Sequence, residues 1–421
     1  MSSIEIEKNI GTSIKFQNDW ESLRIKDLIT KIGSGVTPKG GSEVYVDEGI
    51  TFIRSQNVYN DGLRLNDVSF ITDEVNDRMK NSQIKPFDIL LNITGASIGR
   101  TCIVPISVGK ANINQHIIYL RIKKRKVDFL SYYLKSTFIK DYIMSVQAGS
   151  SKEALNMGQT LNIPVLIPKP IIQTKIAGYL DSKTKTIDKK MALVEKKIGK
   201  YQELRKSLIK RTITKGLNPS VILKQSGVKW VGQIPEHWEV KRVKDIFKIS
   251  RGRVIGKTEL RDDGNYPVYS SQTKNDGVLG FITTYDFNAD LLTWTTDGAN
   301  AGTIFRRKGK FNCTNICGTL IPKYQIQTHL DFFTYAVQES AQHNKRIDTN
   351  GAKIMSNEMS VIKVVNPPIT EQIKIFNYLD KNTTTIDKII NNLKLQNNAL
   401  AELRKTLIND VVTGKIKVIE E

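Results

Sequence analysis

Amide, hydroxyl and guanidinium side chains are concentrated in a few short segments of this 421-residue chain. The clearest are Arg54-Ser55-Gln56-Asn57 in the first half and Ser271-Gln272 in the second. In the major groove of DNA, Asn and Gln amides pair bidentately with adenine, and the Arg guanidinium pairs with guanine. Lys and Arg also bind phosphates. Each of these residues, taken singly, could also be a turn former or a solvated loop group. The charge of the whole chain therefore bears on whether the set binds DNA.

The chain is strongly basic, with 63 Lys and Arg against 42 Asp and Glu, a net charge of +21 and a pI near 9.6. A field of this sign favours polyanions. Together with the polar segments it favours double-stranded DNA over a membrane as the partner. The candidate DNA-binding residues are Arg54, Ser55, Gln56, Asn57, Arg100, Asn114, Gln115 and Lys152 in the first half, and Ser271, Gln272, Lys274, Asn300, Arg306, Arg307 and Lys353 in the second.

Bulk features set the expected location. The apolar stretches are far shorter than the roughly 20 residues that span a bilayer, and the first residues lack the apolar segment of a secretion signal. Three cysteines provide no disulfide framework, which suits a reducing compartment. We therefore expect a cytoplasmic protein with no membrane partner.

Motifs that suggest catalysis are incomplete. The segment 252–258, GRVIGKT, has three residues between its glycines where a phosphate-binding loop needs four. The segment 366–369, NPPI, resembles the base-flipping motif of amino-methyltransferases but has Ile369 in place of the aromatic residue. Cys313 and Cys317 have no second pair with which to form a zinc site. We predict no catalytic residue, no metal site and no cofactor on this chain. A single-chain methyltransferase or nuclease is the enzymatic alternative, and the absence of a glycine-rich cofactor loop argues against it.

The chain is a tandem duplication. Residues 179–206 and 378–405 align without a gap and share the segments YLD, TID and ELRK. Looser parallels extend upstream, where 19–28 matches 237–246, Ser55-Gln56 matches Ser271-Gln272, and 94–99 matches 297–302. Repeats of this kind indicate repeated structural units.

The repeat predicts an α+β fold with two tandem globular domains, each followed by a long helix. Short β-rich runs separated by Gly, Asn and Asp turns indicate strands, with one further helix in each domain over 127–145 and 328–340. The predicted boundaries are an extension over 1–18, the first domain over 19–170, a central helix over 171–215, a linker over 216–236, the second domain over 237–368 and a C-terminal helix over 369–417.

The repeated helices carry a heptad pattern, which predicts that they pair as an antiparallel coiled coil. The predicted seam consists of Ile187, Met191, Val194, Ile198, Tyr201, Leu204 and Leu208 in the first helix, and Ile386, Ile390, Leu393, Leu400, Leu403 and Leu407 in the second. Asn397 is the polar member of the second seam, where it could fix register. The alternative is that each helix merely caps its own domain.

The order of these segments along the chain resembles that of a known protein family. The linker SGVKWVGQIPEHWEVKRVKD (226–245), the segment YPVYSSQ (266–272) and the repeated helices resemble the specificity subunit of type I restriction–modification enzymes over about residues 17–417. The resemblance implies two target-recognition domains that read the two halves of a split DNA site. It also implies that the helices dock two methyltransferase subunits, which restriction subunits then join. S-adenosylmethionine, ATP and magnesium would belong to those partners. The alternative is a standalone DNA-binding regulator or scaffold without enzyme partners.

Overall fold

The computed structural model describes residues 20–122, 127–147, 154–348 and 351–418. The chain divides into two compact units. Unit 1 consists of Met1–Glu195 and Leu395–Glu421, and unit 2 of Lys196–Lys394. Two long helices, α7 (Pro170–Lys215) and α11 (Ile369–Val412), each contribute one part to each unit. The predicted α+β fold is therefore confirmed, with two globular domains that are each followed by a long helix.

The first domain, in unit 1, is built on two four-stranded sheets. The order of one is β2-β11-β8-β9, all antiparallel, and of the other β6-β3-β10-β7, in which β3 and β10 are parallel. The strands are β1 (Glu21–Arg24), β2 (Ile29–Ser34), β3 (Ile50–Ile53), β4 (Val58–Tyr59), β5 (Gly62–Leu63), β6 (Ser69–Ile71), β7 (Gln83–Ile84), β8 (Ile89–Asn92), β9 (Thr101–Ile103), β10 (Ala111–Ile113), β11 (Ile117–Ile122) and β12 (Pro164–Ile167). The helices are α2 (Ile25–Leu28), α3 (Asp73–Arg78), α4 (Val127–Leu134), α5 (Thr137–Ser145) and α6 (Met157–Leu161).

The second domain, in unit 2, repeats this plan around one six-stranded sheet of order β16-β21-β19-β20-β17-β18. The antiparallel pair β15·β24 corresponds to β1·β12 of the first domain. The strands are β13 (Leu223–Gln225), β14 (Gln233–Pro235), β15 (Glu239–Arg242), β16 (Phe247–Arg251), β17 (Tyr266–Tyr269), β18 (Val278–Ile282), β19 (Phe287–Thr295), β20 (Ile304–Cys313), β21 (Cys317–Pro322), β22 (Arg346–Asp348), β23 (Gly351–Lys353) and β24 (Lys363–Asn366). The helices are α8 (Val243–Ile246), α9 (Leu330–Asn344) and α10 (Ser356–Val361).

Two local features differ from the sequence-based prediction. The single helix predicted over 127–145 is broken into α4 and α5, because Ser136 is the N-cap of α5 and its hydroxyl accepts from the backbone N–H of Ile139. The segment predicted to be a linker contains the hairpin β13·β14. Its Val231 and Ile234 are buried in the core of the second domain.

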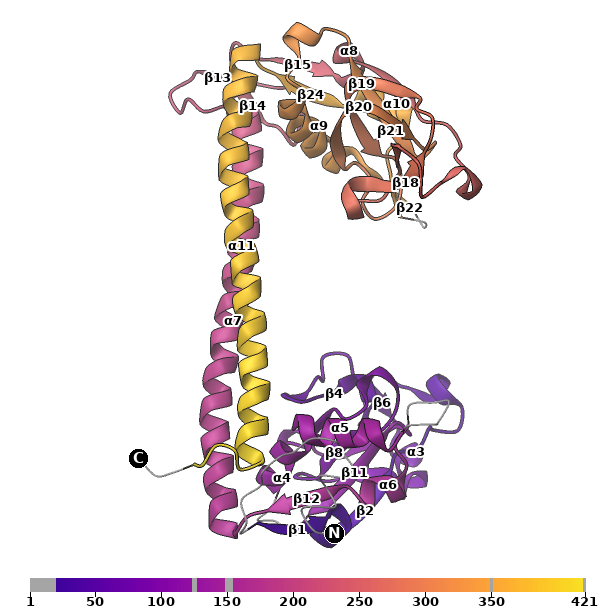
Figure 1. The fold of residues 1–421 in the computed structure, drawn as a ribbon, viewed down its shortest axis with the longest axis vertical. Helices are drawn as coiled ribbons and strands as arrows, with labels where there is room; N and C mark the ends of the chain where they lie inside the picture. The colour runs from indigo at the N-terminus through magenta and orange to yellow at the C-terminus, as the bar shows by residue number, and fades with distance from the viewer. Residues whose placement is uncertain (1–19, 123–126, 148–153, 349–350, 419–421) are drawn as a thin grey trace. The chain divides into compact units, whose positions relative to one another are not determined.

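Within each unit, the parts of α7 and α11 that belong to it run side by side in opposite directions (Figure 1). In unit 1, the Arg404 guanidinium donates to the Asp188 carboxylate, with Nε–Oδ1 2.8 Å. In unit 2, Arg205 donates to Asp387, with Nε–Oδ1 2.9 Å. The two ion pairs are equivalent in the sequence repeat. In each pair the Arg belongs to an ELRK segment of one helix and the Asp to a TID segment of the other. In unit 1, Asn397 Nδ2 donates to Glu195 Oε1 at 2.8 Å, a contact that suits the predicted role of Asn397 in fixing register.

The seam is corrected at one turn of each helix. Ile187, Val194, Ile198, Ile386 and Ile390 are buried, whereas Leu204 and Leu403 are 51% and 54% exposed. The half-buried seam residues are Met191, Tyr201, Leu208, Leu393, Asn397, Leu400 and Leu407. If the seam keeps alternating four- and three-residue steps, the position after Tyr201 is Arg205, and the position after Leu400 is Arg404. Arg205 and Arg404 are the two ion-paired arginines described above. The sequence-based seam broke this alternation in order to include a leucine.

Each long helix ends in the core of a globular domain. The end of α11 contributes Ile408, Val411 and Val412 to the core of the first domain, in unit 1. The end of α7 contributes Ile209 and Ile213 to the core of the second domain, in unit 2. Helix α11 stops at Val412, short of the predicted residue 417, because Gly414 takes the left-handed conformation, φ +75°, that commonly ends helices. Each domain is therefore completed by a helix from the other half of the sequence.

The corrected seam predicts which substitutions destabilise unit 2. Ile386→Ala should lower the free energy of unfolding by about 2–5 kcal/mol, because it removes buried methyl groups. Leu204→Ala should cost less than about 1 kcal/mol, because half of that side chain already faces solvent. Urea unfolding followed by circular dichroism measures both, and equal shifts in the midpoint would show that the seam is wrongly placed.

Candidate nucleic-acid interface

Three loops of the first domain meet where β3, β8 and β10 end. The loops after β3 and β10 are joined because the backbone N–H of Asn114 donates to the carbonyl of Ile53 at 3.0 Å. The loop after β8 is joined to them because the N–H of Ile93 donates to the carbonyl of His116 at 3.0 Å. We call residues 54–57, 94–100 and 114–116 the first polar loop cluster.

Polar side chains occupy the surface of this cluster. The Thr94 hydroxyl lies 2.7 Å from Nδ1 of His116, and Nε2 of Gln115 lies 3.1 Å from the other ring nitrogen of His116. Gln56 and Gln115 are exposed. The cluster thus presents amide and hydroxyl groups, which can hydrogen-bond to base edges.

The second domain builds the same arrangement at the ends of β17, β19 and β20. The backbone N–H of Thr314 donates to the carbonyl of Tyr269 at 2.9 Å, and that of Thr296 donates to the carbonyl of Ile316 at 3.3 Å. These bonds reproduce those of Asn114 and Ile93. We call residues 270–277, 297–303 and 314–316 the second polar loop cluster. The backbone scaffold is repeated, whereas the side chains that it carries differ.

A returning segment borders each cluster. In unit 1, the N–H of Leu155 donates to the carbonyl of Ile93 at 2.8 Å, and in unit 2 that of Ile354 donates to the carbonyl of Thr296 at 2.8 Å. Lys353 pairs with Asp297 in a β-bridge and so lies beside the second cluster. Lys152, its predicted counterpart in the first half, lies outside the described residues.

The predicted residues of the first domain divide into surface and structural groups. Asn57 is 2% exposed; its Oδ1 accepts from the N–H of Arg54, and its Nδ2 donates to the carbonyl of Arg64. Asn114 is also buried. The burial of these two side chains favours a role in holding the loops. Ser55 is half-buried, and its carbonyl accepts from Nδ2 of Asn92.

The predicted residues of the second domain divide in the same way. Lys274 and Asn300 are exposed, and Nδ2 of Asn300 donates to the Thr273 hydroxyl at 3.1 Å. The Ser271 hydroxyl donates to the carbonyl of Ile316, and Nε2 of Gln272 donates to the carbonyl of Val278. Ser271 and Gln272 therefore use these groups to shape the loop.

Two predicted arginines of β20 are held by carboxylates of the domain. Arg306 lies outside both clusters and forms ion pairs with Asp290 at 2.6 Å and Asp331 at 2.5 Å. Its hydrogen bond lowers the pKa of Asp290. Arg307 is 3% exposed and pairs with Asp276 at 2.7 Å. The positions of both side chains favour structural roles rather than direct contact with phosphates.

Two arginines, Arg64 and Arg100, lie against the ring of one tyrosine, Tyr59. The Tyr59 ring, in the hairpin β4·β5, has its centre 5.0 Å from the Arg64 guanidinium and 4.7 Å from that of Arg100, which lies just before β9. Arg100 is a predicted DNA contact, whereas Tyr59 and Arg64 are not among the predicted residues. The Asn60-Asp61-Gly62 sequence could have indicated the hairpin, because such triplets favour tight turns.

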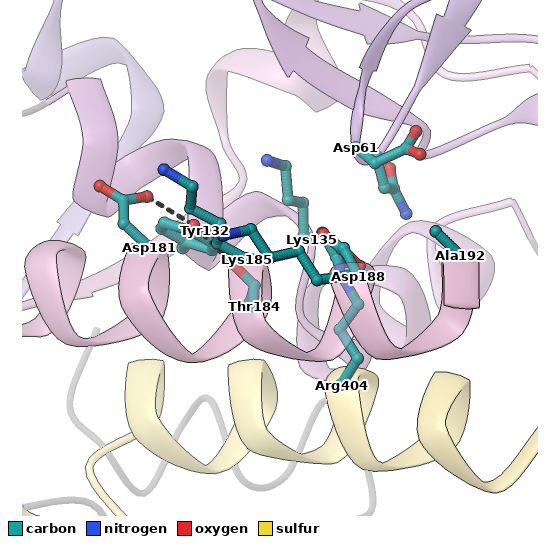
Figure 2. Close-up of a pocket in the computed structure, with 11 residues that line it drawn as sticks. Asp61, Tyr132, Lys135, Asp181, Thr184, Lys185, Asp188, Ala192 and Arg404 are labelled. Carbon is teal, nitrogen blue, oxygen red and sulfur yellow. Dashed lines mark hydrogen bonds and ion pairs between the residues drawn. The ribbon is translucent and has the colours of Figure 1, made fainter. Parts of the chain in front are cut away.

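A cavity of about 600 Å³ lies in unit 1 between the first domain and its helices (Figure 2). The Tyr132 hydroxyl donates to Asp181 at 2.6 Å, and burial, together with this bond, raises the pKa of Tyr132 to about 12. Lys135 lies over the Tyr132 ring at 5.0 Å, with the Arg404–Asp188 ion pair along the same wall.

Unit 2 repeats part of this junction. The Tyr335 hydroxyl lies 3.2 Å from that of Thr383, as Tyr132 lies 3.3 Å from Thr184. The repetition indicates that these contacts belong to the shared framework of the two halves.

Nothing in the described part of the chain forms a metal centre, since no three His, Cys, Asp or Glu side chains there are grouped to hold an ion. Within the same residues, no helix is both long and apolar enough to cross a membrane. Cys313 and Cys317 are buried free thiols.

Comparisons with known proteins agree with this architecture. The family model described as "Type I restriction modification DNA specificity domain" matches residues 17–197 and 235–397, most of both halves. The chain belongs to this family. The relatives that match this chain are named type I specificity subunits. In type I restriction–modification systems this subunit is the non-catalytic component, and catalysis lies on partner subunits.

Individual relatives support the assignment. A putative type I specificity subunit of Mycoplasma pneumoniae is 32% identical over 245 residues, which cover 58% of this chain and 91% of that relative. The specificity subunit of the type I restriction enzyme MpnII from the same organism is 35% identical over 186 residues, 44% of this chain and 54% of the relative. Another putative M. pneumoniae specificity subunit is matched over 59% of its length. In these last two matches the chain therefore spans little more than half of the relative's length.

Solved structures share the fold. A chain from a study titled "Structural basis underlying complex assembly and conformational transition of the type I R-M system" aligns with a TM-score of 0.74 at 12% identity, covering 96% of this chain and all of that one. The HsdS subunit of Thermoanaerobacter tengcongensis aligns with a TM-score of 0.54 at 12% identity, covering 96% of this chain and 99% of that one.

The junction between the first domain and its helices in unit 1 predicts a pH-dependent stability effect. Burial lowers the pKa of Lys135 to about 8, from an ordinary value of 10.5. Between these values the unfolded chain binds more protons than the folded one, so the contribution of Lys135 to stability becomes more favourable as pH rises. Lys135→Met should therefore raise the melting temperature at pH 7, and its advantage should shrink by pH 10.

Thermal melting at the two pH values measures this difference. Lys185→Met is the matched control, because Lys185 is exposed in the same cavity. A Lys135→Met advantage that is absent at pH 7, or that grows with pH, would contradict the prediction.

Proposed function

We propose that this chain reads a split double-stranded DNA site, with each polar loop cluster recognising one half-site. The observation that carries the proposal is the repeated scaffold beneath different side chains. After the buried Asn114 the first cluster presents Gln115-His116, where after the buried Thr314 the second presents Asn315-Ile316. One backbone design with two sets of side chains suits two readers of different sequences. The net charge of +21 supplies the attraction to phosphates.

Mapping methylated bases across the genome tests the proposal. Cells that carry the gene should contain a methylated motif with two specified parts separated by an unspecified gap, and cells that lack the gene should not. An unchanged methylation map would contradict the proposal. It would favour a standalone regulator, which DNA-binding assays and co-purification without enzyme subunits would then identify.

We further propose that the helix pair binds two copies of a methyltransferase subunit. Leu204 in unit 2 and Leu403 in unit 1 occupy equivalent positions in the repeat and are half exposed. Each lies next to an ion-paired arginine, Arg205 or Arg404. Two equivalent surfaces with an exposed leucine suit two copies of one partner. Restriction subunits would join this core, and S-adenosylmethionine, ATP and magnesium would be bound by the partners.

Substitutions at these leucines test the docking proposal. Leu204→Asp and Leu403→Asp should each remove one methyltransferase copy, and the double variant should remove both, because a carboxylate would be buried without a partner. Because both side chains are half exposed, the isolated chain should melt within a few degrees of wild type. Light scattering measures the mass of the complex. Two methyltransferase copies retained by the double variant would place the docking surface elsewhere.

A further inference from the structure

The loop that joins β17 to β18, residues 270–277, is held in an unusual backbone conformation. Asn275 and Asp276 both lie in the left-handed region, with φ of 50° and 51°, and Gly277 follows at 78°. Two consecutive positive φ values resemble the tight hairpin turn that normally requires Asn-Gly. Asp enters this region more easily than most residues, but two consecutive non-glycine residues there cost free energy unless their surroundings hold them.

Arg307 is placed to hold that residue. Its Nη1 donates to the Asp276 carboxylate at 2.7 Å, and its Nη2 donates to the Asp276 backbone carbonyl at 2.7 Å. A fork of two donors therefore fixes both the side chain and the backbone of one strained residue. Gly277 leaves room for this fork, because a Cβ there would lie 2.9 Å from Nη2.

The guanidinium of Arg307 is itself enclosed. It lies 3.7 Å from the centre of the Tyr269 ring and 4.4 Å from that of Phe305, and the residue is 3% exposed. An arginine between two rings and bonded to a carboxylate is fixed in position. The side chains that the loop exposes are Lys274, Asn275 and Asp276.

The corresponding turn of the first domain lacks such a clamp. Asp61, in Asn60-Asp61-Gly62, pairs with Arg64 of the same loop at 2.5 Å, and both side chains are about half exposed. A surface pair of this kind contributes little. Asp61 therefore supplies a matched control for Asp276.

We propose that Arg307 is a positioning residue, which fixes the 270–277 loop in the conformation that reads the second half-site through Lys274 and Asn275. The inference rests on the proposed function. It replaces the expectation that Arg307 contacts phosphate. Holding the loop before binding reduces the entropy lost on binding, so the clamp should raise affinity and sharpen selection at one half-site.

The two roles for Arg307 predict opposite effects at Asp276. If Arg307 bound phosphate, removing the Asp276 carboxylate would free a cation and strengthen DNA binding. If Arg307 positions the loop, Asp276→Ala should weaken binding to the second half-site on the order of tenfold. Asp276→Asn should lose much less, because Asn tolerates the left-handed region and keeps an acceptor.

The experiment uses the complex with its methyltransferase subunits and a library of random DNA duplexes. Wild type and the variants Asp276→Ala, Asp276→Asn, Arg307→Lys and Asp61→Ala are each used to select and sequence bound DNA. Fluorescence anisotropy then measures affinity for the selected site and for versions altered in either half. Asp276→Ala removes a side chain that is 73% exposed and leaves the two rings around Arg307 in place, and thermal melting measures whether the variant stays folded. It therefore keeps the test decisive if Arg307→Lys unfolds the domain.

The expected result is loss of base preference at the second half-site for Asp276→Ala and Arg307→Lys. The first half-site and the salt dependence of binding should be unchanged, and Asp61→Ala should behave as wild type. Wild-type or tighter binding by Asp276→Ala would overturn the inference. If wild type itself selected no two-part site, the proposed function would fail instead.

Discussion

Replacing residues 19–170 with the first domain of a relative that reads another sequence is expected to change one half-site completely and to leave the other intact. The reason is that the first polar loop cluster is formed entirely by residues of unit 1, on strands β3, β8 and β10. Mapping methylated bases in cells that carry the chimera measures both half-sites. A change in both, or in neither, would contradict independent readers.

The structure dictates how this chimera should be built. The core of the first domain includes Ile408, Val411 and Val412 from the end of α11. In addition, Oδ1 of Asn409 accepts from the Thr137 hydroxyl at 2.7 Å. A graft of 19–170 alone therefore leaves a mismatched core. Two chimeras are therefore compared. One carries only the grafted first domain, and the other also carries the donor segment equivalent to residues 407–413. The second chimera should have the higher melting temperature.

Lengthening both long helices by one heptad is expected to abolish methylation of the original site. A copy of residues 191–197 is inserted after Lys197 in α7, and a copy of 388–394 after Lys394 in α11. Seven residues keep the seam in phase and lengthen each helix by about 10 Å, at about 1.5 Å per residue. If continuous helices set the spacing of the readers, the preferred gap should grow by about three base pairs, at roughly 3.4 Å each.

Selection from random DNA measures the new gap, with both half-sites expected to keep their sequences. Insertion of two residues in each helix is the control, because it rotates the apolar seam away from its partner and should prevent assembly. If the heptad variant methylated the original site at its original spacing, the helices would not set the gap. The segment 216–236 would then be tested by the same kind of insertion.

The heptad pattern shows both the strength and the limit of the sequence. Ile187 and Ile386 are buried as the pattern predicted, because apolar residues at this period form one face of a helix. The spacing of leucines places Leu204 and Leu403 in the same seam, but strict helical phase places Arg205 and Arg404 there instead. Residue type alone could not reveal this, because each arginine is accommodated by an aspartate far away in the sequence, Asp387 or Asp188.

The predicted DNA-binding residues likewise fall into those that the sequence identified correctly as surface groups and those that it did not. Gln56, Gln115, Lys274 and Asn300 were selected by residue type, and the structure places them on the polar loop clusters with at least part of each side chain exposed. Arg307 was selected for the same reason, yet it is buried against Asp276. A guanidinium has the same chemistry in a DNA contact and in an internal clamp, so only the surrounding strands distinguish the two roles.

The sequence by itself determined the duplication, the α+β class, the two long helices and the family, because periodicity and repeated segments are local properties of the chain. The tertiary structure decided which polar residues share a surface, which arginines are enclosed by carboxylates, and that the end of each long helix completes the core of the domain from the other half. Those outcomes depend on contacts between residues far apart in the sequence. Burial and ion pairing are set by such contacts, and no local pattern specifies them.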